Sequence, residues 1–316
     1  MAKISVTGSA LAGFGVIARQ PGAVLIWGVV MLILSLAPVL ALIPLMGPEL
    51  MKTIAALMQT QSGELDPDSI SQMMQLQSGL MLIQVGGWLW GTFIKALICS
   101  AIFRAVLEPA QSRGAFLRLG PQELWLALLF LVVSVLAYIV AVLASIGVLV
   151  PALVVGLSSG PQGQGAAAGV LTGFGLAFVA VLLLIWLALR LSLAAPMTFA
   201  DRQFRLFESW ALTRGSTWRL LGVAVLSLLI LLVLELILAG VVLSALFMAG
   251  GPPVWLSDPQ AVQAFLARPP LDLLRSTWPW LAVIGLVWSV IGPGLFAIVC
   301  APWAAAYRDL TRQPGT

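Results

Sequence analysis

Two ionisable side chains stand inside long apolar runs of the sequence and are the first candidates for chemistry. Lys95 lies in the run that ends at Phe103, and Glu235 lies in the run that begins at Leu220. A charge near the centre of a bilayer costs about 2.5–3.5 kcal/mol on insertion scales, so an ionisable residue there marks a candidate functional site. The two could pair with each other. Alternatively, Lys95 could donate to backbone carbonyls or water, and Glu235 could stand protonated against a polar group such as Gln84.

Depth within the membrane argues against a direct pair. Lys95 lies 9 residues from Arg104, and Glu235 lies 17 residues from Trp218, if those two residues mark the same interface. At 1.5 Å of rise per helical residue these separations are about 13 Å and about 25 Å. Pairing therefore remains one alternative, and separate partners remain the other.

A helix-breaking triplet lies in the last apolar run, at Gly292, Pro293 and Gly294. Proline removes a helical hydrogen bond and the flanking glycines relax the backbone, so the triplet predicts a kink. Transporters place such breaks at their substrate sites, although kinks also serve packing alone. A small transporter or channel that uses Lys95, Glu235 and this kink is the alternative function.

Enzyme chemistry is disfavoured by the side chains that the sequence offers. It contains no histidine, the residue most used for proton transfer near neutral pH and the commonest metal ligand. Cys99 and Cys300 both sit in apolar runs, where small buried hydrophobes are the usual interpretation. Glu64, Asp66 and Asp68 form an acidic group, but they fit the start of a helix better than a metal site. We expect no catalytic residue, no metal site and no cofactor.

Composition decides which elements must position these residues. Apolar residues make up 61% of the chain and charged residues 9%, whereas soluble domains carry about 25% charged residues. Apolar runs of 20 or more residues are long enough to cross a bilayer, where only internally bonded helices satisfy the backbone. The prediction is an all-α polytopic membrane protein, with six transmembrane helices arranged as three hairpins in a single domain over residues 1–316. The expected spans are 23–46, 80–103, 124–149, 166–189, 220–248 and 281–304.

The distribution of basic residues orients these spans. Of the 16 basic residues, 12 fall on the side that holds both termini, so the N- and C-termini are expected in the cytoplasm. Basic residues scattered at span ends give no nucleic-acid footprint. The segment 1–19 lacks the pattern of a cleaved signal peptide. Asp66–Pro67 and Asp258–Pro259 each favour the start of a short helix at the opposite surface.

The segment Asp201–Arg219 forms an elbow between the fourth and fifth spans. Four apolar residues recur there at spacings that place them on one helical face: Phe204, Phe207, Trp210 and Ala211. Gly215 is a natural helix stop, and Trp218 is a natural interfacial anchor. The elbow is either a surface helix that places the fifth span, or a docking surface for lipid headgroups or a partner.

These residues also carry a family resemblance. Arg190 and Pro196, followed by the string ESWALTRGSTWR from Glu208 to Arg219, resemble the motif of bacterial integral membrane proteins related to the membrane domain of glycerophosphoryl diester phosphodiesterases. Three further strings fit the same group: Arg19–Pro21, Ala115–Leu124 and Tyr307–Leu310. The resemblance implies a six-helix inner-membrane domain, and the sequence has no counterpart of the soluble phosphodiesterase barrel. The motif and interface residues are expected to be architectural: Arg104, Arg190, Pro196, Ser209, Trp210, Thr213, Arg214, Gly215, Trp218 and Arg219.

The function expected from the sequence is therefore that of a non-enzymatic bacterial inner-membrane protein. Its elbows and surface helices suit a scaffold that contacts membrane lipids or a membrane-protein partner. Nucleic acid is not an expected partner.

Overall fold

The structure is a computed structural model that describes residues 4–38, 67–110, 112–158, 164–248 and 270–311. Within these ranges the regular structure is entirely helical, without a strand. Six of the described helices are long and apolar enough to cross a membrane. The predicted fold class is confirmed, and the chain is a multi-pass helical membrane protein.

The six long helices contain the described parts of the predicted spans. Their bounds are Pro21–Pro38 (called the first span below), α4 (Pro67–Leu107), α5 (Pro121–Ser158), α6 (Gln164–Leu191), α9 (Thr217–Met248) and α12 (Pro270–Thr311). Short helices connect or precede them: α1 (Val6–Ala10), α2 (Ala12–Arg19), η2 (Arg113–Phe116), α7 (Ala194–Asp201) and α8 (Glu208–Leu212). Residues 39–46 of the expected first span lie outside the described residues.

The surface helix expected after Asp66–Pro67 is not a separate element. Pro67 does begin a helix, but that helix is α4 itself, which runs unbroken to Leu107. Between Pro67 and Gly79 the sequence has no glycine or proline to interrupt it. The corresponding expectation after Asp258–Pro259 lies outside the described residues.

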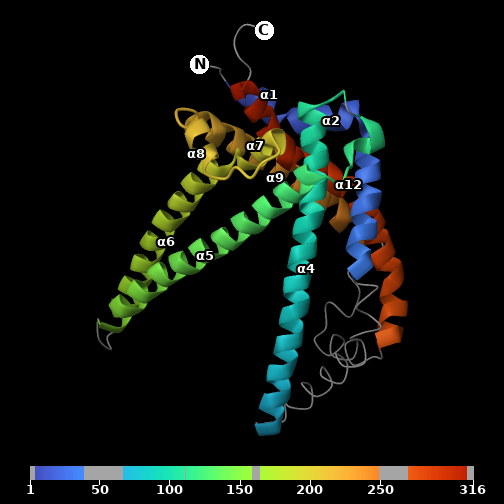
Figure 1. The fold of residues 1–316 in the computed structure, drawn as a ribbon. Helices are drawn as coiled ribbons and strands as arrows, with labels where there is room; N and C mark the ends of the chain where they lie inside the picture. The colour runs from blue at the N-terminus through green and yellow to red at the C-terminus, as the bar shows by residue number, and fades with distance from the viewer. Residues whose placement is uncertain (1–3, 39–66, 111, 159–163, 249–269, 312–316) are drawn as a thin grey trace.

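Helix α1 and the end of α12 lie at one end of the molecule, together with α2, α7 and α8 (Figure 1). We call this the terminal end. α4, α6 and α12 all finish there, and each carries an arginine in its last turn, where a cation complements the helix dipole. α5 and α6 pack side by side and lean away from α4 (Figure 1).

The first span packs against both α4 and α12, so the predicted arrangement as three hairpins stays a prediction. The indole Nε1 of Trp90 in α4 donates to the Leu34 carbonyl at 2.7 Å. On the α12 side, Pro293 has no N–H for the Ser289 carbonyl, the acceptor one turn earlier. A Cβ added at Gly28 would lie 1.7 Å from that carbonyl oxygen. Glycine at position 28 therefore lets the first span approach α12 at the proline.

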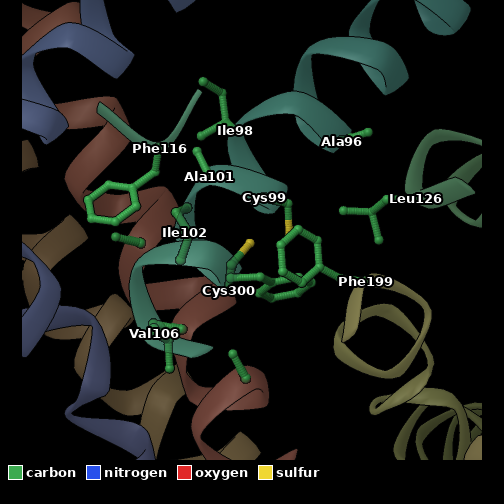
Figure 2. Close-up of a cluster of buried hydrophobic side chains, with 14 of the residues drawn as sticks. Ala96, Ile98, Cys99, Ala101, Ile102, Val106, Phe116, Leu126, Phe199 and Cys300 are labelled. Atoms are coloured by element: carbon green, nitrogen blue, oxygen red, sulfur yellow. The ribbon is translucent and has the colours of Figure 1, made fainter. Parts of the chain in front are cut away.

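The protein core lies at the terminal end and is centred on α4. The most apolar window of α4 is 67% buried, whereas those of α6 and α9 are 0% and 6% buried. Alanines on α4 and α12, including Ala101, Ala301 and Ala304, are buried, and small residues let membrane helices approach closely. Figure 2 shows side chains from α4, α5, α7 and α12 gathering around Cys99 and Phe199. The remaining spans present large apolar side chains outward, as lipid contact requires.

The elbow differs from the single amphipathic face that its spacing indicates. Helix α7 ends at Asp201 because Arg202 takes a left-handed conformation, with φ of 55°. The Thr198 hydroxyl then accepts from the Arg205 N–H at 3.2 Å and holds a non-helical turn. As a result, Phe207 is 73% exposed while Trp210 is partly buried. Helix α8 ends at Leu212, and Gly215, the expected helix stop, lies three residues later in the turn before α9, with φ of 86°.

Candidate functional site

The first feature of the candidate site is a buried ion pair that joins the end of α4 to the start of α5. Arg104 and Glu123 are both buried, with 2.5 Å between Nη2 and Oε1. Nη2 also donates to Gln122 Oε1 at 3.2 Å, and Nη1 donates to the Phe116 carbonyl. The guanidinium lies over the Phe199 ring, 5.4 Å from its centroid. We call these five residues the Arg104 clamp.

The loop before α5 is shaped to serve this clamp. Gly114, Ala115 and Phe116 have φ of 64°, 53° and 65°, a region that costs non-glycine residues about 1–3 kcal/mol each. The resulting turn directs two carbonyls at buried donors. The Ala115 carbonyl accepts from Trp27 Nε1 at 2.7 Å, and the Phe116 carbonyl accepts from Arg104. The backbone strain is therefore offset by two hydrogen bonds inside the core.

The Arg104 clamp also reaches α7, the helix that leads into the elbow. Gln122 Nε2 donates to the Phe199 carbonyl in α7 at 3.2 Å. The Phe103 and Phe199 rings meet edge to face, with centroids 5.9 Å apart. A buried charge that loses its partner costs about 3–5 kcal/mol, so this joint fixes α4, α5 and α7 relative to one another.

The second feature is an aromatic clamp at the end of α6. The Arg190 guanidinium lies 5.6 Å from the Trp186 ring centroid and 5.4 Å from that of Trp210. The two indoles are nearly perpendicular, 5.0 Å apart. The Arg190 carbonyl accepts from Ser209 Oγ at 2.8 Å, and Thr213 Oγ1 lies 3.5 Å from it. We call these five residues the Arg190 clamp.

No carboxylate pairs with Arg190 in the described part of the chain. Its Nε and Nη1 are buried without a hydrogen-bond partner there. The charge is held instead by the negative faces of two indoles, each contact worth about 0.5–2 kcal/mol depending on desolvation. The clamp fastens α8, and with it the elbow, to the end of α6.

Four of the predicted motif residues thus meet in one place: Arg190, Ser209, Trp210 and Thr213. Pro196 is buried in the first turn of α7, and Gly215 makes the turn before α9. The three remaining elbow residues point outward: Arg214, Trp218 and Arg219. Trp218 is 84% exposed, which suits a side chain that lies among lipid headgroups.

The third feature is an apolar cavity of about 630 Å³ among α4, α5, α6, α9 and α12. It lies beside both clamps, because its lining includes Phe103, next to Arg104, and Leu189 and Leu191, which flank Arg190. Its volume falls within the roughly 300–1,000 Å³ of small-molecule sites. We call it the apolar cavity. Other lining residues are Cys99, Leu129, Ala188, Ala224, Cys300 and Trp303.

The predicted intramembrane polar site is not brought together. Lys95 and Gln84 on α4 and Glu235 on α9 are all exposed, and no ion pair joins Lys95 to Glu235 among the described residues. Gly292 and Pro293 are buried, and Gly294 is partly buried. None of these six residues lines the apolar cavity.

Sequence reasoning missed the acidic partner of Arg104. A signal was present, because Arg104 ends one apolar run and Glu123 begins the next, so both stand at the same interface. It also missed the indole partner of Arg190, although Trp186 precedes it by four residues, the spacing of neighbours on a helix surface.

Fold and site together define a class: a multi-pass helical membrane protein whose terminal end holds two arginine clamps beside an apolar cavity. Comparison with known proteins finds no matching family model, no matching curated protein and no matching solved structure. The resemblance to phosphodiesterase membrane domains therefore rests on the sequence motif alone and stays a prediction.

Proposed function

We propose that this chain is a non-enzymatic scaffold of the bacterial inner membrane that holds a membrane lipid at its terminal end. The apolar cavity is the observation that carries the proposal. Its walls come from five membrane-spanning helices and are almost entirely hydrocarbon. The Arg104 clamp joins α4 to α5, and the Arg190 clamp fastens α8 to α6, so each clamp holds helices that line the cavity.

The apolar lining of the cavity determines which kind of molecule can occupy it. A cavity lined by apolar side chains does not hold water, because water needs polar partners. Within a bilayer the abundant apolar molecule is a lipid acyl chain. Moving that chain from lipid into protein gains no hydrophobic energy, so binding must come from packing against the walls. Shape, rather than polarity, then sets which chains fit.

The bias of basic residues supports a cytoplasmic location for the terminal end, with 12 of the 16 on that side. Large apolar side chains project there beside these charges, including Leu119, Phe207 and Trp218, at 77%, 73% and 84% exposure. Such a mixture matches a surface seated among headgroups. This bias and the motif resemblance together support a location in the bacterial inner membrane.

The test is lipid retention after purification in detergent-free copolymer discs, read by mass spectrometry of the bound lipids. Ala188→Phe and Ala224→Phe fill the cavity from α6 and α9. Each should lower the retained lipid at least about fivefold, the ratio that about 1 kcal/mol of binding free energy gives. Ala239→Phe is the matched control, because Ala239 lies on α9 outside the cavity and is exposed.

Unchanged lipid retention in both filled variants would overturn the proposal. A stoichiometric protein that co-purifies in place of lipid would also overturn it and would make the partner-contacting form of the scaffold the better account.

A further inference from the structure

A second recess, of about 300 Å³, opens at the terminal end between α1, α2, α4 and α12. We call it the basic groove and define it by Gly15, Arg19, Gln20, Val106 and Arg308, which lie along it. It shares no lining residue with the apolar cavity. Its lining combines two guanidinium groups and an amide with small or apolar walls.

Arg308 has donors in this groove that the protein leaves unused. Its Nη1 donates to the Val106 carbonyl at 3.4 Å, close to the limit for a hydrogen bond. Its Nε is buried and has no partner in the described part of the chain. A guanidinium carries five N–H donors in a planar fork, and buried donors in native proteins normally find acceptors. The Nε group is enclosed by the protein, so an acceptor that enters the groove meets the other N–H donors of this guanidinium.

No carboxylate lines the basic groove among the described residues. Glu108 and Asp309 are the closest carboxylates in sequence, and neither lines the groove. Asp309 Oδ2 accepts from the Ser5 N–H at 3.3 Å. No ion pair of Arg19 or Arg308 occurs among the described residues. The groove therefore presents two positive charges toward whatever enters it.

We propose that the basic groove binds a phosphate group through Arg19 and Arg308. Several phosphate oxygens can accept from two guanidinium forks at once, which a single carbonyl or hydroxyl oxygen does not do. The phosphate is either inorganic phosphate or the headgroup of a phospholipid, and both present the same chemistry to the arginines. This site is independent of the apolar cavity and of the function proposed for it.

Two variants test the groove from different directions. Gly15→Phe projects into open space, because a Cβ built there meets nothing within 4 Å, and it fills the groove. Arg19→Gln removes one charge from an exposed position. Gly22→Phe and Arg214→Gln are the matched controls, because Gly22 is equally open and Arg214 is equally exposed, and neither lines the groove.

The full-length protein in maltoside micelles is titrated with inorganic phosphate, and separately with micellar phosphatidylglycerol or uncharged diacylglycerol, with binding read by thermal shift and native mass spectrometry. We expect saturable binding of phosphate or of phosphatidylglycerol, but not of diacylglycerol. Binding of phosphate alone identifies a free-phosphate site, and binding of phosphatidylglycerol alone identifies a headgroup site. Both groove variants should raise the apparent Kd at least about tenfold, the loss of one hydrogen bond to a charged group.

Failure of the wild-type protein to bind either phosphate source would overturn the inference. Equal loss of binding in Arg214→Gln would do the same, because it would show general charge attraction rather than a site. If Gly15→Phe fails to fold, Arg19→Gln decides alone, and unchanged binding in that variant contradicts the proposal.

Discussion

Of the three arginines in the last turns of helices that finish at the terminal end, Arg104 and Arg190 have their charges accommodated in different ways. Arg104, at the end of α4, is buried and pairs with Glu123 at 2.5 Å. Arg190, at the end of α6, lies against Trp186 and Trp210 without a carboxylate among the described residues. Their backbone carbonyls have different donors as well. The Arg104 carbonyl accepts from the Glu108 backbone N–H, whereas the Arg190 carbonyl accepts from the Ser209 hydroxyl.

The degree of burial explains the difference. A fully buried cation needs an anion, because desolvation costs several kcal/mol that only a close charge repays. A partly buried cation keeps some hydration, so aromatic faces are enough to hold it. The Arg104 clamp is therefore a core joint whose members depend on one another. The Arg190 clamp is a surface joint, and substitution of any one of its residues should lower the free energy of unfolding by less.

The largest effect should come from breaking the core pair. Glu123→Leu leaves the buried Arg104 charge without compensation and should lower the free energy of unfolding by about 3–5 kcal/mol. The measurement is a denaturant titration in mixed micelles, followed by tryptophan fluorescence. Little or no loss would contradict the assignment of the Arg104 clamp as a core joint.

A double variant separates charge from packing. Arg104→Leu together with Glu123→Leu removes both charges and should recover part of the stability that Glu123→Leu loses. Recovery will be incomplete, because the Phe116 carbonyl loses its donor. A double variant as unstable as the single one would show that the uncompensated charge is not the cause.

A substitution in the Arg190 clamp should lower the free energy of unfolding by less than Glu123→Leu does. Arg190→Leu removes two cation–π contacts but leaves no unpaired carboxylate behind, so we expect a loss of about 1–2 kcal/mol. The same titration measures it, with Arg190→Lys as a control that keeps the charge. If Arg190→Leu lowers the free energy of unfolding as much as Glu123→Leu does, Arg190 has a counter-charge, and the proposed difference between the two clamps is wrong.

The smallest effect should come from the hydroxyl that bonds to the Arg190 carbonyl. Ser209→Ala removes one hydrogen bond, while Thr213 Oγ1 remains 3.5 Å from that oxygen. We expect a loss of about 1 kcal/mol in the free energy of unfolding. Limited proteolysis of the elbow in the variant should also quicken, since α8 loses part of its attachment to α6. Stability and proteolysis both unchanged would show that α8 does not depend on this bond.

The spans were predictable from sequence because their signal is length and polarity alone. An apolar run such as that of α6 is stable in a bilayer only as a membrane-spanning helix, so the length of the run predicts the length of the helix. The extension of α4 back to Pro67 follows from local rules too, since nothing interrupts the helix there. The elbow was less predictable, because the left-handed Arg202 depends on a hydrogen bond between Thr198 and Arg205 that spacing does not reveal.

The candidate site was predictable only in part. The motif residues Arg190, Ser209 and Trp210 do meet, but their partner Trp186 and the ion pair of Arg104 depend on which helices become neighbours. The cavity forms only where five helices pack together, and a sequence pattern does not predict which helices become neighbours. Lys95 and Glu235 were singled out only because a charge inside a bilayer is costly. That cost does not predict whether the side chain points into the protein or outward.

Lipid occupancy of the apolar cavity is the central claim, and photocrosslinking tests it most directly. The protein is reconstituted with a phospholipid that carries a diazirine in its acyl chain, irradiated, and mapped by mass spectrometry. The account predicts crosslinks at Leu129 and Cys300, buried residues that line the cavity, and their loss in Ala188→Phe. Crosslinks confined to exposed α9 positions such as Leu229 and Leu236 would show that lipid only bathes the outer surface, and would contradict the claim.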